Sequence, residues 1–167
     1  MPNNGLPVYA FTIRHGGLAR QLLSDTTISY NGKSIVVRSI WDTGATNSCI
    51  SMDVVSSLSL TPTGKSVINT PAGPKEVSTY LVDVSLSENV NIPDLRVCDS
   101  DIGEQNVGML IGMDIIAQGD FSISNLDKKT VFSFRIPSIQ LTDYVKQSQA
   151  KSVIGPTHGQ GKRKRKR

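Results

Sequence analysis

The stretch of this sequence best suited to chemistry is an acidic residue followed by a tight turn. Asp42 comes after the β-branched run 35–37 and is followed directly by Thr43 and Gly44. Such a run predicts a strand that carries the carboxylate to its end, and glycine lets the backbone fold closely beside the acid. The Thr43 hydroxyl can brace the loop with a hydrogen bond. We therefore take Asp42 as the candidate general acid or base.

Two later stretches of the sequence contain apolar, glycine and proline residues in patterns that predict local structure. Residues 109–116, Met-Leu-Ile-Gly-Met-Asp-Ile-Ile, place a glycine after a short apolar run. Residues 67–77 contain Pro71, Gly73 and Pro74 between two β-rich runs. Proline and glycine at these positions predict the tip of a hairpin.

Taken together, the Asp-Thr-Gly-Ala run, residues 67–77 and residues 109–116 resemble the retropepsins, the single-domain aspartic proteases of retroviruses and their bacterial relatives. The resemblance covers residues 18–136, and the bacterial members are the most similar. It implies a mainly β fold, a small closed barrel with a flap hairpin and one or two short helices.

The resemblance also implies a role for each matching residue. Asp42 would be the catalytic acid, supported in its loop by Thr43, Gly44 and Ala45. The remaining assignments form two groups. Flap and substrate-binding residues would be Asn69, Thr70, Pro71, Ala72 and Gly73, and the segment bracing the loop would be Leu110, Ile111 and Gly112. No metal or cofactor is implied.

Peptide hydrolysis by carboxylates needs two of them, one to take a proton from water and one to donate a proton to the carbonyl oxygen. They share one proton because two like charges so close cannot both form, a behaviour for which the aspartic proteases are the standard example. This chain has one Asp-Thr-Gly, so the second acid must come from another copy of the chain across a two-fold axis. We therefore expect a homodimeric aspartic endopeptidase, with an extended peptide or protein segment bound as an added strand.

A non-catalytic dimer that binds peptides as an adaptor is the alternative, although nothing departs from the motif at Asp42, Thr43 or Gly44. Trp41 is bulkier than the aliphatic residue that viral relatives carry there, which leaves the local packing open. Serine or cysteine catalysis is disfavoured because His15 and His158 lie in turn and tail sequence.

Asp114 and Ala45 raise two further questions. Asp114 lies at the start of a short predicted helix, where the helix dipole favours a negative side chain. We expect Asp114 to stabilise the helix start, and we do not expect it to be a second catalytic acid in the same chain. Ala45 follows the motif where pepsin-like relatives commonly carry a hydroxyl group. Without that donor, the pair of acids should keep its shared proton to higher pH.

The length of 167 residues and a hydrophobic content of 38% predict one globular domain. No apolar run approaches the roughly 20 residues of a membrane helix, so we expect no membrane contact. The first residues lack the pattern of a signal peptide. Cys49 and Cys98 form neither a disulfide framework nor a metal-binding spacing. We therefore expect a cytoplasmic protein.

The net charge of +4 comes from the C-terminal end. Residues 162–167 are all basic, and the rest of the chain has 12 basic and 14 acidic residues. This run is either a solvated tail or a weak electrostatic contact for nucleic acid or an acidic partner. We expect an N-terminal arm or edge strand at 1–17, the retropepsin-like domain at 18–151 and a disordered basic tail at 152–167.

Local patterns predict several elements. Asn31 and Gly32 lie between the β-rich runs 26–30 and 33–37, which favours a type I′ hairpin turn. Residues 52–58 have helical spacing, with Ser51 as N-cap. Similar patterns predict strands at 90–98, 121–124 and 130–136, and a short helix at 137–151.

Overall fold

The structure is a computed structural model that describes residues 7–70, 73–102 and 106–153. Within these ranges, no helix is long and apolar enough to cross a bilayer. The strands and helices, in chain order, are β1 (Tyr9–Arg14), β2 (Leu23–Tyr30), β3 (Lys33–Trp41), β4 (Cys49–Ser51), α1 (Met52–Leu58), β5 (Gly64–Thr70), β6 (Gly73–Ser87), β7 (Val90–Ser100), β8 (Met109–Ile111), α2 (Met113–Ile116), β9 (Asp120–Ser124), the 3-10 turn η2 (Leu126–Lys128), β10 (Val131–Ile136) and α3 (Tyr144–Val153).

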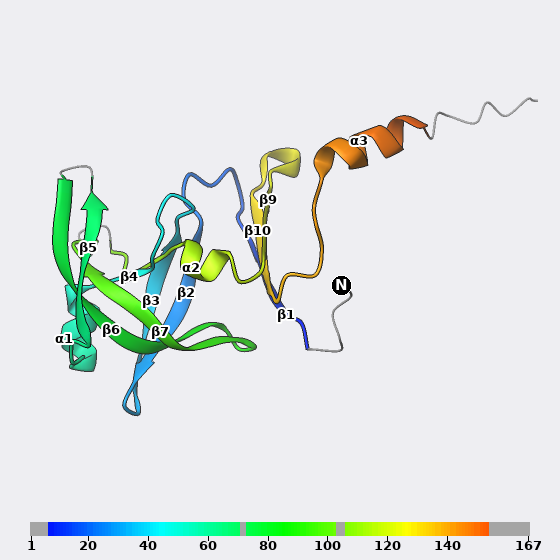
Figure 1. Cartoon of the computed structure of the whole chain (residues 1–167). Coiled ribbons are helices and arrows are strands. Elements are labelled where there is room, and N and C mark those ends of the chain that lie inside the picture. Colours follow the sequence, from blue (N-terminus) through cyan, green and yellow to red (C-terminus); the bar gives the residue numbers. More distant parts are fainter. Residues whose placement is uncertain (1–6, 71–72, 103–105, 154–167) are drawn as a thin grey trace, which may run out of the picture.

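A closed barrel of six strands forms the body of the molecule (Figure 1). Its strands follow the order β2-β3-β8-β4-β7-β6, and pairing of β2 with β6 closes the ring. The pairs β3–β8 and β4–β7 are parallel, whereas the other pairs in the ring are antiparallel. This mainly β architecture with few short helices confirms the fold predicted from the resemblance.

The hairpin of β2 and β3 delivers the candidate acid to the barrel. Asn31 and Gly32 both have positive φ, 47° and 76°, as a type I′ turn requires. The register then runs from Tyr30 opposite Lys33 to Leu23 opposite Ile40. Regular pairing over this length carries the chain to Trp41, and Asp42 follows at the end of the strand.

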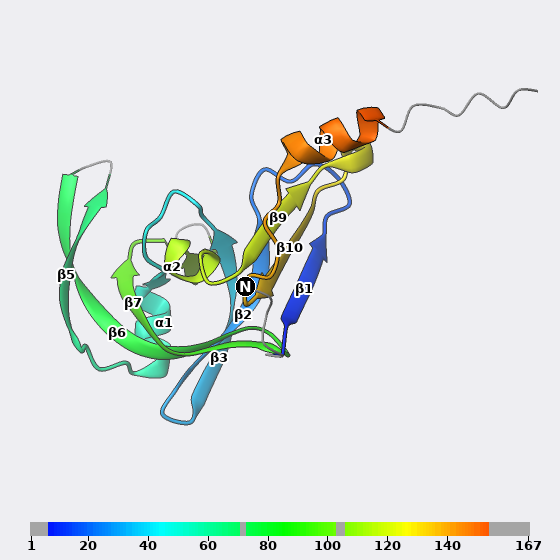
Figure 2. The same cartoon turned by 45° about the vertical axis from the view of Figure 1, so that its right-hand side comes forward.

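A second sheet of three strands stands beside the barrel, in the order β1-β10-β9 (Figure 2). All its pairs are antiparallel, and β1 and β9 are its edge strands. Helix α3 lies on the side of this sheet that is away from the barrel (Figure 1). The sheet thus joins the N-terminal strand to the last strand before α3.

An aromatic cluster connects the three-stranded sheet to the strand that ends at the candidate acid. Trp41 stacks on Phe121, with ring centroids 5.3 Å apart and planes 4° apart. It also contacts Phe11, Phe132 and Phe134, so the cluster contains every phenylalanine of the chain. The indole N–H donates to Ser24 Oγ at 2.9 Å. The fold therefore accommodates the bulky Trp41 side chain, which packs β3 against the three-stranded sheet.

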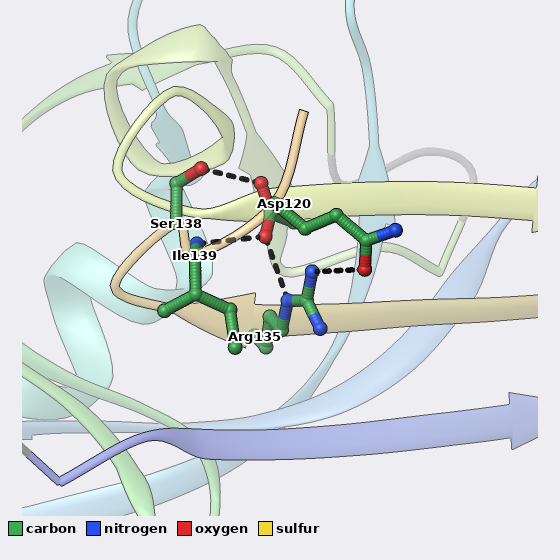
Figure 3. Close-up of polar contacts among 5 residues, drawn as sticks. Asp120, Arg135, Ser138 and Ile139 are labelled. Atoms are coloured by element: carbon green, nitrogen blue, oxygen red, sulfur yellow. Dashed lines mark hydrogen bonds and ion pairs between the residues drawn. The ribbon is translucent and has the colours of Figure 1, made fainter. Parts of the chain in front are cut away.

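A group of polar contacts secures the segment after β10 (Figure 3). The Asp120 carboxylate accepts hydrogen bonds from Arg135 Nε at 2.6 Å, from Ile139 N–H at 3.0 Å and from the Ser138 hydroxyl. Burial alone raises the pKa of Asp120, but these donors and the Arg135 charge outweigh it and lower the pKa from 3.8 to about 2. The contacts tie the chain that leads to α3 to the start of β9.

The predicted elements agree with the structure except near the C-terminal end. Helix α1 has the predicted bounds, and Ser51 Oγ accepts from Val54 N–H as its cap. The helix expected within 137–151 instead starts at Tyr144 and ends at Val153. Residues 137–143 are not helical, because Ser138 and Ile139 donate to Asp120.

Candidate active site

Asp42 lies on the loop between β3 and β4, half-buried, directly after the barrel strand. Its backbone N–H donates to Ile111 O at 2.9 Å, which fixes the acid against β8. Its carboxylate Oδ1 accepts from Gly44 N–H at 2.8 Å. A Cβ on residue 44 would lie 3.1 Å from the same oxygen, closer than most real contacts of this kind. The loop therefore orients the carboxylate through its own backbone.

The rest of this loop is held by the start of α2. Met113 N–H donates to Ala45 O at 2.8 Å, and Asp114 N–H donates to Thr46 O at 3.1 Å. Gly112 is the N-cap of α2. A Cβ there would come within 2.7–3.0 Å of backbone atoms of Asn47 and Ser48. Only glycine lets the two segments approach this closely.

The side chain of Asp114 braces the loop in a way that the sequence did not reveal. One carboxylate oxygen accepts from Ser48 N–H at 2.8 Å, and the other accepts from Ser48 Oγ at 2.7 Å and from Ile115 N–H at 2.9 Å. The bond to Ile115 is the favourable helix-start contact that we expected. Ser48 Oγ in turn accepts from Gly112 N–H at 3.0 Å. Ser48 is fully buried, so Asp114 satisfies donors that water cannot reach.

The structure places the predicted site residues as follows. Leu110, Ile111 and Gly112 lie beside the loop that carries Asp42, on β8 and at the start of α2. Thr43 and Gly44 are exposed and Ala45 is half-buried. The Thr43 hydroxyl makes no hydrogen bond within the described part of the chain. Its surface position leaves it available for contact with a second molecule.

The predicted flap is the hairpin of β5 and β6, on one side of the barrel (Figure 2). Asn69 is exposed and pairs in register with Pro74, and Thr70 pairs with Gly73, whose φ is +112°. Pro71 and Ala72 lie outside the described residues.

A pocket opens between β5, β7 and the loop that carries Asp42. Its lining includes Asn47 from the loop, Ile68 from β5 and Thr79 from β6. Cys98 of β7 and Asp114 complete the side nearest the loop. Asp42 does not line this pocket.

The chain resembles known proteins in sequence and in fold. The family profile described as Aspartyl protease matches residues 26–115, from β2 to α2. The crystal structure of a retropepsin-like aspartic protease from Rickettsia conorii has 10% sequence identity and a TM-score of 0.51, over 80% of this chain and 99% of that one. A search of curated proteins found no match.

Two further solved structures are similar at lower TM-scores. The EIAV protease in complex with the inhibitor HBY-793 has 21% identity and a TM-score of 0.45, over 60% of this chain and 88% of that one. The retroviral protease-like domain of Ddi1 from Leishmania major has 16% identity and a TM-score of 0.41, over 71% of this chain and 98% of that one. The profile spans more than half of the sequence and includes both the Asp42 loop and the segment that braces it. The chain belongs to the aspartyl protease family, with a retropepsin-like fold.

Proposed function

We propose that this protein is an aspartic endopeptidase that acts as a homodimer, with one Asp42 from each subunit in a shared site. The observation that carries the proposal is the position of Asp42 at the end of β3, where Gly44 N–H holds its carboxylate and Ile111 O holds its backbone. The family profile covers this loop. A single half-buried acid with a fixed orientation is half of the machinery that peptide hydrolysis needs.

In the proposed dimer, the two Asp42 carboxylates share one proton. The charged carboxylate takes a proton from a water molecule, the resulting hydroxide attacks the peptide carbonyl carbon, and the protonated carboxyl donates to the carbonyl oxygen. Collapse of the tetrahedral species with proton transfer to the amide nitrogen releases the two products. The bond from Gly44 N–H fixes Oδ1 throughout. The exposed Thr43 hydroxyl is placed for a contact with the paired loop.

We propose an extended peptide or protein segment as the substrate. Such a segment binds by adding a strand to an existing one, and the hairpin of β5 and β6 stands beside the pocket that the loop residue Asn47 lines. The proposal includes Asn69, Thr70, Pro71, Ala72 and Gly73 as the flap of each subunit. No metal ion or cofactor takes part in the proposed reaction.

The free cysteines and the basic C-terminal run bear on location and on other partners. Two free thiols fit a reducing compartment, so we propose the cytoplasm. Residues 162–167 lie outside the described part of the chain, and their six positive charges support a weak, salt-sensitive contact with nucleic acid or an acidic protein. We propose the domain limits 18–151, with an arm at 1–17 and a tail at 152–167.

The test is incubation of the purified protein with a mixed peptide library, with products identified by mass spectrometry. We expect cleavage that a statine-type transition-state analogue blocks. Asp42→Asn should abolish it while the far-UV spectrum and unfolding midpoint stay unchanged, because an amide oxygen can still accept from Gly44 N–H. The control is Asp25→Asn, the same substitution at an exposed residue of β2.

Cleavage that persists in Asp42→Asn would contradict the proposed mechanism. If the unmodified protein binds library peptides and releases them intact, the alternative of a non-catalytic peptide-binding dimer is supported instead.

A further inference from the structure

The two cysteines of the chain, 49 positions apart, meet in the barrel. Cys49 begins β4 and Cys98 lies near the end of β7, and they occupy opposite positions of this parallel strand pair. Directly opposed residues point their side chains to the same face of a sheet. The two sulfur atoms are 3.0 Å apart, and both thiols are free. The fold thus creates a dithiol that the sequence spacing alone gave no reason to expect.

The strand geometry suits a covalent bond between these residues. Neighbouring strands lie about 4.8 Å apart, which falls within the Cα separation of about 4.4–6.8 Å that disulfides span. The side chains already point toward each other, so closing the bond needs only a small movement of the sulfur atoms. The backbone pairing of β4 and β7 can therefore stay as it is.

The surroundings make the two thiols chemically unequal. The hydrogen-bond contact with the Cys49 sulfur lowers the pKa of Cys98, although burial and the nearby carboxylates of Asp99 and Asp114 act in the opposite direction. The same contact with Cys98, together with burial, raises the pKa of Cys49. Cys98 is therefore the sulfur that ionises first and reacts first with an electrophile.

The pair lies close to the surface of the barrel and to a pocket. Cys49 is half-buried, and Cys98, although buried, lines the pocket between the flap strand and the catalytic loop. The pair also adjoins the braced part of that loop, since Ser48 O accepts from Cys98 N–H at 3.3 Å. An oxidant the size of hydrogen peroxide could enter where a peptide side chain would otherwise lie.

We propose that Cys49 and Cys98 form a redox modification site, which hydrogen peroxide converts from a dithiol to an intramolecular disulfide. The Cys98 thiolate attacks one peroxide oxygen, the O–O bond breaks, and the products are a sulfenic acid and hydroxide. Hydroxide takes the proton of the Cys49 thiol and leaves as water. The Cys49 thiolate then attacks the Cys98 sulfur, the S–O bond breaks, and the departing hydroxide takes up the proton that Cys98 first released. Two thiols are oxidised, one peroxide is reduced and two waters form.

The site requires no peptidase activity, so its test is independent of the proposed function. Buried cysteines that only fill space in a core are chemically inert. Two observations indicate reactivity here: the two sulfurs are in direct contact, and Cys98 is one of the residues that line a pocket.

The experiment treats the native full-length protein with a small excess of hydrogen peroxide and follows intact mass, with peptide mapping under non-reducing conditions. We expect the loss of two hydrogen atoms, localised to a linked pair of peptides that contain Cys49 and Cys98, and reversal by dithiothreitol. The native protein should form the bond at least about tenfold faster than the urea-denatured chain, because the fold holds the thiols together. The oxidised protein should also unfold at a higher temperature.

Single variants test the order of the steps. In Cys49→Ser, Cys98 should be trapped as a dimedone adduct of its sulfenic acid, whereas in Cys98→Ser the labelling of Cys49 should be much weaker. Three outcomes would overturn the proposal: no linked peptides, a disulfide only between two chains, or bond formation no faster in the native protein than in urea. Irreversible oxidation of one cysteine to the sulfinic acid, without a bond to the other, would also overturn it.

Discussion

Removing the Asp114 carboxylate should loosen the loop that carries Asp42 and lower the stability of the whole fold. In Asp114→Ala, Ser48 N–H and the Ser48 hydroxyl lose their acceptor, and Ser48 is fully buried. A buried donor without a partner costs about 1–3 kcal/mol, so two such donors cost about 2–6 kcal/mol of the free energy of unfolding. In Asp114→Asn one oxygen still accepts, so the loss should be about 1–3 kcal/mol.

Urea denaturation at a fixed protein concentration measures these losses. The expected order of stability is wild type, then Asp114→Asn, then Asp114→Ala. The control is Asp25→Ala, which removes a negative charge from an exposed position of β2. Peptidase activity should fall in the same order, because the bonds to Ser48 hold the loop that positions Asp42. If the control and Asp114→Ala have the same unfolding free energy, or if Asp114→Ala keeps full activity, the bracing role is wrong.

Three further predictions concern pH, acid stability and the basic tail. Ala45→Ser, which adds a hydroxyl donor next to the Asp42 loop, should move the pH–rate profile to lower pH. An unchanged profile, or one moved to higher pH, contradicts this. Because the pKa of Asp120 is lowered to about 2, its contacts should contribute at most about 2 kcal/mol to the free energy of unfolding above pH 4, and this contribution should be lost between about pH 4 and 2. Asp120→Asn should remove that part of the pH dependence in acid unfolding curves, and wild-type and variant curves with the same pH dependence would refute it. Deletion of residues 155–167 should weaken binding to DNA at low salt without changing the unfolding midpoint; unchanged binding or a much lower midpoint would count against the proposed tail.

Local sequence signals were sufficient where one short segment determines its own structure. Asn31 and Gly32 tolerate the positive φ that a type I′ turn needs, so the hairpin and its register were predictable. Ser51 can cap a helix through its own side chain, and the bounds of α1 followed from it. Proline cannot donate to a strand ladder, and the register of β6 and β7 shifts between Val82 and Val84, opposite Pro93.

Contacts between distant segments could not be predicted in the same way. The pairing of Cys49 with Cys98 depends on β4 lying parallel to β7, a pairing that no local pattern specifies. Asp114 was expected to favour the start of a helix, but its main contacts are with Ser48, 66 positions earlier. The aromatic residues that surround Trp41 likewise come from both ends of the chain. The missed start of α3 has the same cause, because Asp120 holds residues 138 and 139 out of the helix.

Mixing of subunits tests most directly whether two subunits each supply one Asp42 to a single site. Wild-type protein at a fixed concentration is equilibrated with increasing amounts of Asp42→Asn chains, and cleavage of one peptide is measured. Since pairing of subunits is random, a ninefold excess of the variant should lower activity per wild-type chain to about one tenth. Activity that stays constant per wild-type chain, while sizing shows that mixed dimers have formed, would contradict the shared site.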